Sequence, residues 1–158
     1  MKVEYVFVFL FGFLSCAFLF FVFSFSGFGI SGFGILDLGS LSSPSDWVSE
    51  DDIIVLDDRI ILMIENATLS NYVATGSMKP LFDAGANGIR VVPKSEDEIS
   101  VGDIVSFGLG EKLVVHRVVE KGVDGEGVYF VTRGDNNLIS DGKIRFENIE
   151  YVTIGIIF

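Results

Sequence analysis

The stretch at positions 104–119, IVSFGLGEKLVVHRVV, indicates how the second half of this chain folds. Two runs rich in Val, Ile and Leu stand on either side of a Gly-rich segment at 108–111. Such runs around a short segment with Gly are typical of a β-hairpin. Side chains alternate between the two faces of a strand, so His116 shares a face with the Val residues two positions before and after it. The sequence therefore predicts a hairpin whose second strand carries the only His of the chain.

Similar apolar runs recur on both sides of this hairpin. The runs at 53–56 and 60–64 flank the acidic segment Asp57-Asp58-Arg59 and predict another hairpin. No convincing amphipathic helical pattern follows position 47. Further strands are expected at Ile89–Val92, Val128–Thr132 and Val152–Ile157. Many short strands joined by Gly and Asp turns indicate an all-β domain.

The N-terminal part of the chain predicts a membrane anchor. Val6 to Phe25 reads VFVFLFGFLSCAFLFFVFSF, twenty residues without a charge, which is the length of a helix that spans a bilayer. Lys2 precedes this run and no basic residue follows it until Arg59, so the positive-inside rule places the N-terminus in the cytoplasm and the rest outside. A cleaved signal peptide is the alternative. An uncleaved anchor is favoured because the run is long and lacks a good small-x-small cleavage site.

Composition divides the chain into three parts. Residues 1–25 form the expected membrane anchor. Residues 26–46 form an expected linker rich in Gly and Ser, which begins with the tandem repeat SGFGI-SGFGI. Residues 47–158 form the expected β-domain, which carries every candidate functional residue.

Charge and cysteine content argue against several classes of protein. The chain has 11 Lys and Arg against 22 Asp and Glu, a net charge of −11, and no basic stripe, so nucleic acid is not an expected partner. The single cysteine, Cys16, lies inside the apolar run, which rules out a disulfide within one chain. Neither the Cys spacing nor a His cluster of a metal site is present, and no cofactor or metal is expected.

Three short segments carry the residue types of a serine hydrolase. Ser77 lies in ATGSMKP, directly after a Gly that permits a tight turn, and His116 lies in the apolar strand. Asp135 and Asp141 lie in the turn-rich segment RGDNNLISD at 133–141. A poorly solvated His can act as a base near neutral pH, and a carboxylate can orient its ring. The residues alone leave open whether Asp135 or Asp141 orients the His116 ring. Each segment taken alone is also typical of an ordinary turn or of a buried core strand.

Together the segments resemble the type I signal peptidases, in particular the archaeal and endoplasmic-reticulum branch. The family boxes G-S-M-x-P, G-D-I-V, V-x-H-R-V and G-D-N-N correspond in order to Gly76-Ser77-Met78-Lys79-Pro80, Gly102-Asp103-Ile104-Val105, Val114-Val115-His116-Arg117-Val118 and Gly134-Asp135-Asn136-Asn137, with Asp141 further on. The resemblance runs from about residue 47 to the end of the chain. Because the bacterial branch has Lys as its base, His116 indicates the Ser–His branch.

The resemblance implies a role for each of these residues. Ser77 would be the nucleophile, His116 the general base and Asp141 the third member of the triad, while Asp135 would support the turn. Thr75 stands two residues before Ser77, at the place where the family uses a hydroxyl in its oxyanion hole. One such donor contributes about 3 kcal/mol to a transition state.

The resemblance also implies a fold and a function. The fold would be a signal-peptidase-like β-domain of coiled antiparallel sheets behind one N-terminal transmembrane helix. The protein would be a membrane-bound serine endopeptidase, single-pass in the cell membrane with its catalytic domain on the extracytoplasmic side. Its partners would be signal-peptide-bearing preproteins and the lipid bilayer, the latter through residues 6–25. Asp103 would be a turn residue rather than a catalyst.

Two alternatives compete with this interpretation. A self-cleaving Ser protease of the repressor type shares the β-fold, but it uses a Lys base and a DNA-binding domain, so His116 and the expected anchor argue against it. A non-catalytic, membrane-tethered β-domain that binds extended peptides belongs to a different class. Such a domain would have no reason to keep Ser, His and Asp in this order.

Overall fold

The computed structural model describes residues 41–110 and 112–158. The expected membrane span at 6–25 and most of the expected linker lie outside these residues. Within the described ranges, no helix is long and apolar enough to cross a membrane.

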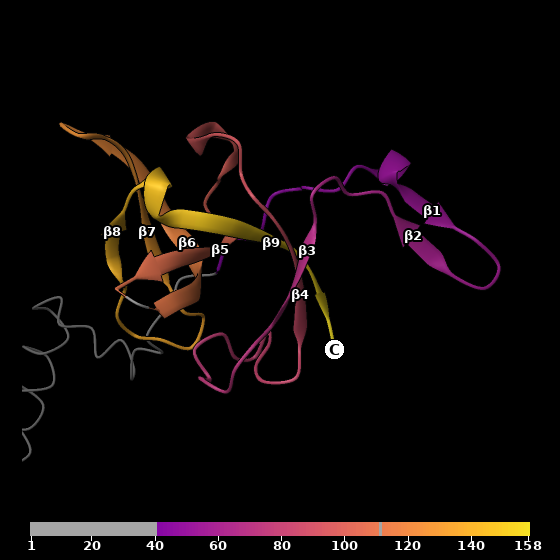
Figure 1. Ribbon diagram of the computed structural model, residues 1–158. Coiled ribbons are helices and arrows are strands. Elements are labelled where there is room, and N and C mark those ends of the chain that lie inside the picture. The colour runs from indigo at the N-terminus through magenta and orange to yellow at the C-terminus, as the bar shows by residue number, and fades with distance from the viewer. Residues whose placement is uncertain (1–40, 111) are drawn as a thin grey trace, which may run out of the picture. The chain divides into compact units, whose positions relative to one another are not determined.

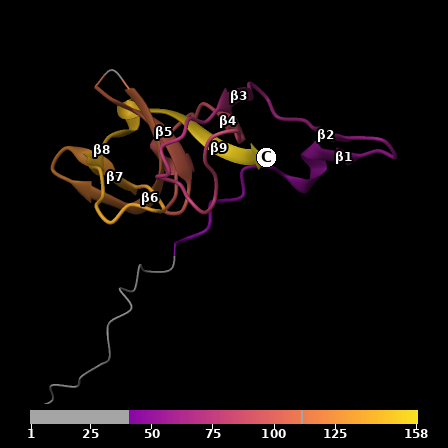
Figure 2. The same cartoon turned by 90° about the horizontal axis from the view of Figure 1, so that it is seen from below.

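The described residues form antiparallel strands arranged in two sheets (Figures 1 and 2). A two-stranded sheet contains β1 (Ile53–Val55) and β2 (Ile60–Leu62). A seven-stranded sheet follows the order β3-β4-β9-β5-β6-β7-β8. Its strands are β3 (Thr68–Asn71), β4 (Asn87–Val91), β5 (Ile104–Leu109), β6 (Lys112–Asp124), β7 (Gly127–Arg133), β8 (Gly142–Ile144) and β9 (Ile149–Ile157). Three short 3-10 turns, Glu50–Asp52, Glu96–Glu98 and Phe146–Asn148, are the helical elements among the described residues. The predicted all-β class is therefore confirmed.

The two hairpins predicted from apolar runs are present. Ile53 pairs with Leu62 across the β1–β2 turn, and Ile104 pairs with Arg117 across the β5–β6 turn. The sequence predicts that the His strand ends at Val119, whereas β6 continues to Asp124. The added part of the strand is polar, and its Lys121 side chain is held by hydrogen bonds. The ammonium donates to the carbonyl oxygens of Glu96 and Ile99, each at 2.8 Å.

Strands β3 and β8 were missed by the sequence analysis. Both are short, and both are edge strands of the seven-stranded sheet. Polar residues dominate β3, whose sequence is TLSN, and β8 contains only GKI. Edge strands bury little side-chain surface, so apolar periodicity does not mark them.

Apolar clusters lie on both faces of the central strand β5. Val105 and Phe107 belong to one cluster with Val118, Phe130 and Val152, all fully buried. Ile104, on the opposite face, belongs to the other cluster; its further members are Tyr72, Met78, Phe82 and Ala86. Strand β9 lies between β4 and β5 and joins the two halves of the sheet (Figure 1). The long hairpin β5–β6 is thus packed from both sides.

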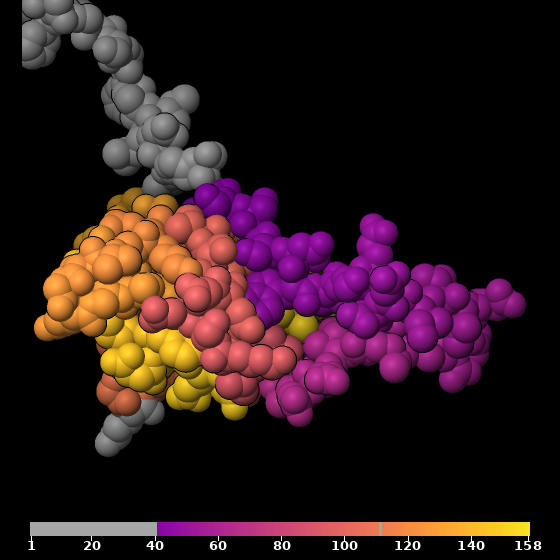
Figure 3. Space-filling view, turned by 90° about the horizontal axis from the view of Figure 1, so that it is seen from above, coloured from indigo at the N-terminus to yellow at the C-terminus, as the bar shows by residue number. Residues whose placement is uncertain are grey.

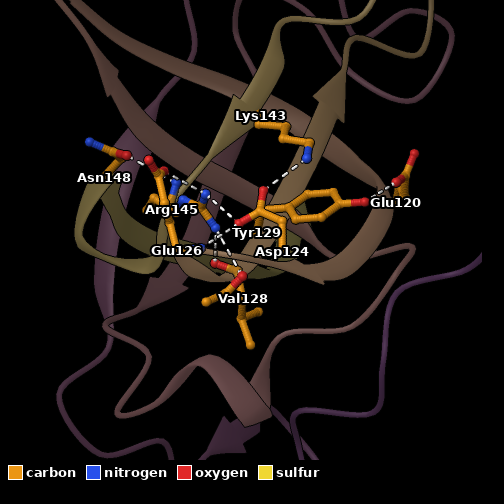
Figure 4. A network of polar contacts seen from close by, with 9 residues as sticks. Glu120, Asp124, Glu126, Val128, Tyr129, Lys143, Arg145 and Asn148 are labelled. Atoms are coloured by element: carbon orange, nitrogen blue, oxygen red, sulfur yellow. Dashed lines mark hydrogen bonds and ion pairs between the residues drawn. The ribbon is translucent and has the colours of Figure 1, made fainter.

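A network of charged groups closes the far end of β6, β7 and β8 (Figure 4). Asp124, at the end of β6, accepts from Lys143 at 2.9 Å and from Arg145 at 2.8 Å. Arg145 also contacts Glu126 at 2.9 Å, and the Lys143 ammonium lies 3.7 Å from the ring centre of Tyr129. These contacts join three neighbouring strands through exposed and half-buried groups, and pairs of this kind contribute little alone.

Asp124 makes this network sensitive to acid. Lys143 and Arg145 hold the pKa of its carboxyl well below the usual range, because both donate hydrogen bonds to the charged form. A carboxyl with a depressed folded pKa adds stability above its unfolded pKa and loses that contribution as the pH falls below about 4. We expect Asp124→Asn to be slightly less stable than the wild type at neutral pH, with a difference that shrinks on acidification. Urea unfolding followed by the fluorescence of the single Trp47 measures it, and a difference that grows below about pH 4 would contradict the expectation.

Candidate active site

Ser77 lies on a tight turn that follows β3. Gly76 precedes it with a φ of 71°, a left-handed conformation that Gly adopts without strain. The Asp83 carboxylate accepts from the Gly76 N–H at 3.1 Å and pairs with the Lys79 ammonium at 2.9 Å. These contacts lower the pKa of Asp83, with Lys79 the largest cause. The Asp83 carboxylate, a few residues further along the chain, therefore stabilises the turn that carries Ser77.

Apolar packing fixes the same turn from below. Met78, the residue after Ser77, is buried in the cluster that contains Tyr72 and Phe82. The rings of Tyr72 and Phe82 stack with their centres 4.3 Å apart. Because the Met78 side chain points into this cluster, Ser77 is left half-buried at its surface.

His116 lies in the first half of β6, opposite Val105 of β5. Its side chain is only 8% exposed. The Nδ1 atom of the ring lies 2.6 Å from Oδ2 of Asp141. A carboxylate accepts, so this contact assigns the proton to Nδ1 and leaves Nε2 free as an acceptor.

A second donor holds Asp141 in place. The hydroxyl of Thr132, which is fully buried in β7, donates to Oδ2 of Asp141 at 2.9 Å. The backbone N–H of Asp141 donates to the Thr132 carbonyl at 2.8 Å. Asp141 is thus fixed at the end of β7 by both its side chain and its backbone.

Asp135 contacts a different residue. Its carboxylate forms a two-pronged ion pair with Arg117, from Nε to Oδ1 at 2.8 Å and from Nη2 to Oδ2 at 2.7 Å. The side chains of Arg117 and Asp135 are 7% and 2% exposed. The sequence left open which Asp approaches His116. The structure brings Asp141 to the imidazole and places Asp135 on the neighbouring Arg.

The turn that carries Asp135 also holds the Ser77 turn. Asn136 donates from its backbone N–H to the Ser77 carbonyl at 2.8 Å and from its side chain to the Gly76 carbonyl at 3.1 Å. Thr75 lies beside Ser77, with 3.1 Å between the two hydroxyl oxygens and 3.4 Å from the Ser77 N to Thr75 Oγ1. The described residues contain no hydrogen bond between Ser77 and His116.

Ser77 and His116 nevertheless line one cleft of about 750 Å³. One wall is the segment after β3, including Val73, and the other is the start of β6, including Leu113. Strand β7 pairs with β6 only from Arg117 onward, so within the described chain the edge of β6 at 112–116 has no partner strand. The cleft is therefore bordered by a free strand edge directly before His116.

Several supporting residues escaped the sequence analysis. Thr132 and Asp83 carried no specific signal beyond a polar side chain in or beside a turn. Asn136 belongs to the Gly134-Asp135-Asn136-Asn137 box, but the box does not predict its hydrogen bonds to the Ser77 turn. Asp103 was expected to be a turn residue, and its carboxylate is fully buried and accepts hydrogen bonds from Ser45 and Ser100. Among residues 41–110 and 112–158, no three His, Cys, Asp or Glu side chains gather in a way that could hold a metal ion.

The buried pair Arg117–Asp135 has a measurable consequence for stability. Removing one partner leaves a buried charge without compensation, which typically costs about 3–5 kcal/mol. We expect Arg117→Met to lower the free energy of unfolding by about that amount, and the double variant Arg117→Met/Asp135→Leu to recover part of the loss because it buries no lone charge. Urea titrations of the full chain give both values. A double variant no more stable than Arg117→Met would argue against an uncompensated charge as the cause.

Comparisons with known proteins give several relatives that are named as signal peptidases. No family model matches the chain, and no solved structure matches it. The signal peptidase complex catalytic subunit SEC11 of Fusarium vanettenii is 33% identical over 82 residues, which is 51% of this chain and 48% of that protein. The SEC11 subunit of Candida tropicalis has the same identity and coverage. Signal peptidase I W of Bacillus subtilis is 35% identical over 81 residues, 49% of this chain and 42% of that protein.

The chain thus spans about half the length of the curated relatives it matches. Eukaryotic and bacterial relatives alike carry the name of signal peptidases. The resemblance read from the four sequence boxes is therefore confirmed: over the matched half of its length, this chain is related to the type I signal peptidases.

Proposed function

We propose that this protein is a membrane-bound serine endopeptidase that removes signal peptides from secreted preproteins. The observation that carries the proposal is the contact of 2.6 Å between His116 and Asp141 in the cleft that also contains Ser77. A Ser hydroxyl and an imidazole oriented by a carboxylate are the parts of a nucleophilic acyl-transfer site. The relationship to signal peptidases supplies the substrate class.

The mechanism follows from these groups. Oγ of Ser77 attacks the carbonyl carbon of the scissile peptide bond while Nε2 of His116 takes its proton. The same proton passes to the leaving amine as the peptide bond breaks, and an acyl ester remains on Ser77. Water then attacks the ester, His116 takes a proton from it, and Ser77 recovers that proton as the carboxylate product leaves. Asp141 keeps Nδ1 protonated and stabilises the imidazolium in both halves of the reaction.

Two hydrogen-bond donors beside Ser77 are proposed to stabilise the negative charge that develops on the oxygen of the scissile carbonyl. The Ser77 N–H lies 3.4 Å from Thr75 Oγ1, so the two groups are adjacent on one side of the nucleophile. Both can donate to an oxygen that gains negative charge in the tetrahedral intermediate. For both to do so, the Thr75 hydroxyl turns away from Ser77 when substrate binds, which ends its contact with Ser77 Oγ and releases the Ser77 N–H that donates to it.

The cleft fits an extended peptide. The free edge of β6 at 112–116 offers backbone groups to a bound strand, which is recognition by β-augmentation. Met78 and Phe82 form an apolar floor under Ser77. Selection of small side chains before the cut is part of the proposal because the family resemblance implies it.

The proposal also includes where the protein is located in the cell. The uncharged run at 6–25 anchors the chain as a single-pass protein, with the catalytic domain outside the cytoplasm. His116 assigns the chain to the Ser–His branch, which the archaeal and endoplasmic-reticulum enzymes form. The fungal relatives are named as catalytic subunits of a complex, which makes partner subunits for this chain a part of the same proposal.

Cleavage of a preprotein by the full-length protein in detergent or lipid vesicles tests the mechanism. We expect Ser77→Ala and His116→Ala to lose at least about 10³-fold in kcat, because nucleophile and base act as one unit. Lys143→Ala, in the distal network, serves as the control with activity close to that of the wild type. A fluorophosphonate probe is expected to label Ser77 in the wild type. Full activity in either site variant would overturn the mechanism.

The two Asp residues can be separated in the same assay. Asp141→Asn removes the negative charge that stabilises the imidazolium, and its NH2 group can favour the wrong tautomer of His116, so a loss of about 10³–10⁴-fold in kcat is expected with little loss of stability. Asp135→Asn weakens the pair with Arg117, so its primary effect is expected on the unfolding midpoint. If Asp135→Asn were inactive while folded, and Asp141→Asn fully active, the assignment of Asp141 to the triad would be wrong.

A further inference from the structure

The segment at 42–45, which we call the strap, lies against the catalytic domain at the start of the described chain. In Figure 3 the indigo residues that begin the described chain lie directly against the pink and orange body of the molecule. The Ser45 N–H donates to Oδ1 of Asp103 at 2.7 Å, and the Ser45 hydroxyl lies 3.4 Å from Oδ2 of the same carboxylate. The strap is therefore held by a specific acceptor rather than by apolar packing alone.

Asp103 is suited to hold the strap. It is fully buried, directly before β5, and it also accepts from the Ser100 N–H at 2.8 Å. Its own carbonyl accepts from the Val118 N–H at 2.8 Å, which ties it to β6 two residues beyond His116. A buried carboxylate with these bonds fixes the strap to the strand that carries the proposed base.

Gly102 shows how closely the strap approaches. Its φ is 108°, and a Cβ atom built on it would lie 2.0 Å from the Ser43 carbonyl oxygen. No residue with a side chain fits there without displacing the strap backbone. The space at Gly102 is thus shaped for the strap.

The strap also reaches the residue next to His116. The carbonyl of Ser42 accepts from Nη1 of Arg117 at 3.1 Å, and the Gly102 carbonyl accepts from the same nitrogen at 2.8 Å. The other two guanidinium nitrogens bind Asp135, whose turn holds the Ser77 backbone through Asn136. Arg117 is therefore the junction between the strap, the His116 strand and the Ser77 turn.

We propose that the strap is a positioning segment for the reaction and that Asp103 is the positioning residue that holds it. The strap fixes the guanidinium of Arg117 from one side, while Asp135 fixes it from the other. Arg117 then sets the position of His116 on its own strand relative to Ser77 on the turn held by Asn136. The inference rests on the proposed function, since it assigns the strap a part in bringing nucleophile and base together.

Substitutions in the full-length protein separate positioning from mere stability. Ser45→Pro removes the backbone N–H that donates to the Asp103 carboxylate, and Asp103→Ala removes the carboxylate that accepts this hydrogen bond. We expect each to lower kcat for preprotein cleavage by about 10–100-fold with KM within about twofold, because displacement of a reacting group by about 1 Å has effects of that size. Asp103→Asn keeps an oxygen for the Ser45 N–H but turns an NH2 group towards the Ser100 N–H, so it is expected to lower kcat by only about three- to fivefold. Ser45→Ala loses only the longer contact and should fall by less than about threefold.

The control is Asp124→Ala, which disturbs the distal network of Figure 4 and leaves kcat unchanged at a temperature where all variants are folded. A second readout needs no activity. His116 is the only His, so its ring protons give isolated NMR signals. Ser45→Pro and Asp103→Ala are expected to shift those signals, and Asp124→Ala is expected not to.

Each outcome decides between the proposals. If Ser77→Ala is inactive while the strap variants keep both the wild-type kcat and the wild-type His116 signals, the strap is only structural and the inference fails alone. If Ser77→Ala is active, the proposed function fails, whatever the strap does to His116. If Ser45→Pro and Asp103→Ala do not fold, Asp103→Asn is the deciding variant, and a kcat and His116 signals equal to those of the wild type overturn the inference.

Discussion

The ion pair between Arg117 and Asp135 is the interaction on which the site geometry depends. Arg117 makes four hydrogen bonds, two to Asp135 and one each to the carbonyls of Gly102 and Ser42. Removing two charges from water costs free energy. Here the hydrogen bonds that the guanidinium donates to four oxygen acceptors offset that cost. The result is a rigid joint between β6, the segment before β5 and the turn after β7. His116 is attached to the first of these, and Asp141 follows the last.

Two carboxylates six residues apart have different surroundings, and the difference separates their roles. Asp135 faces a permanent cation and is held as a structural anion. Asp141 faces an imidazole and a threonine hydroxyl, neither of which carries a permanent charge. In the proposed mechanism, only the second arrangement gives the imidazole a carboxylate that can stabilise it when it takes a proton from Ser77. The sequence segment RGDNNLISD places both Asp residues near His116, and the partner contributed by another strand distinguishes them.

Much of this architecture could be predicted from local sequence, and the part that could not has a physical reason. Strand β5 pairs with the first half of β6 as their β-branched runs predict, although β6 continues beyond the predicted end at Val119, and the Gly-Ser-Met turn stands where its motif places it. Apolar periodicity reports burial, so it missed β3 and β8 at the sheet edges. The supporting contacts of Thr132, Asn136 and Asp103 join residues distant in sequence or across a turn, and no spacing rule encodes them. Asp103 in particular reads as a turn residue because its partner, Ser45, lies 58 positions away.

The open edge of β6 has a consequence for when the proposed reaction can occur. A peptide that enters the cleft becomes an additional strand beside residues 112–116, so its own backbone groups must be free to pair. A segment that is still helical, or that has already joined a sheet of its own, has no such groups to offer. Under the proposed function, the cleft would therefore discriminate by folding state as well as by side chain. Cleavage would be confined to the interval after a segment unwinds and before the protein that carries it has folded.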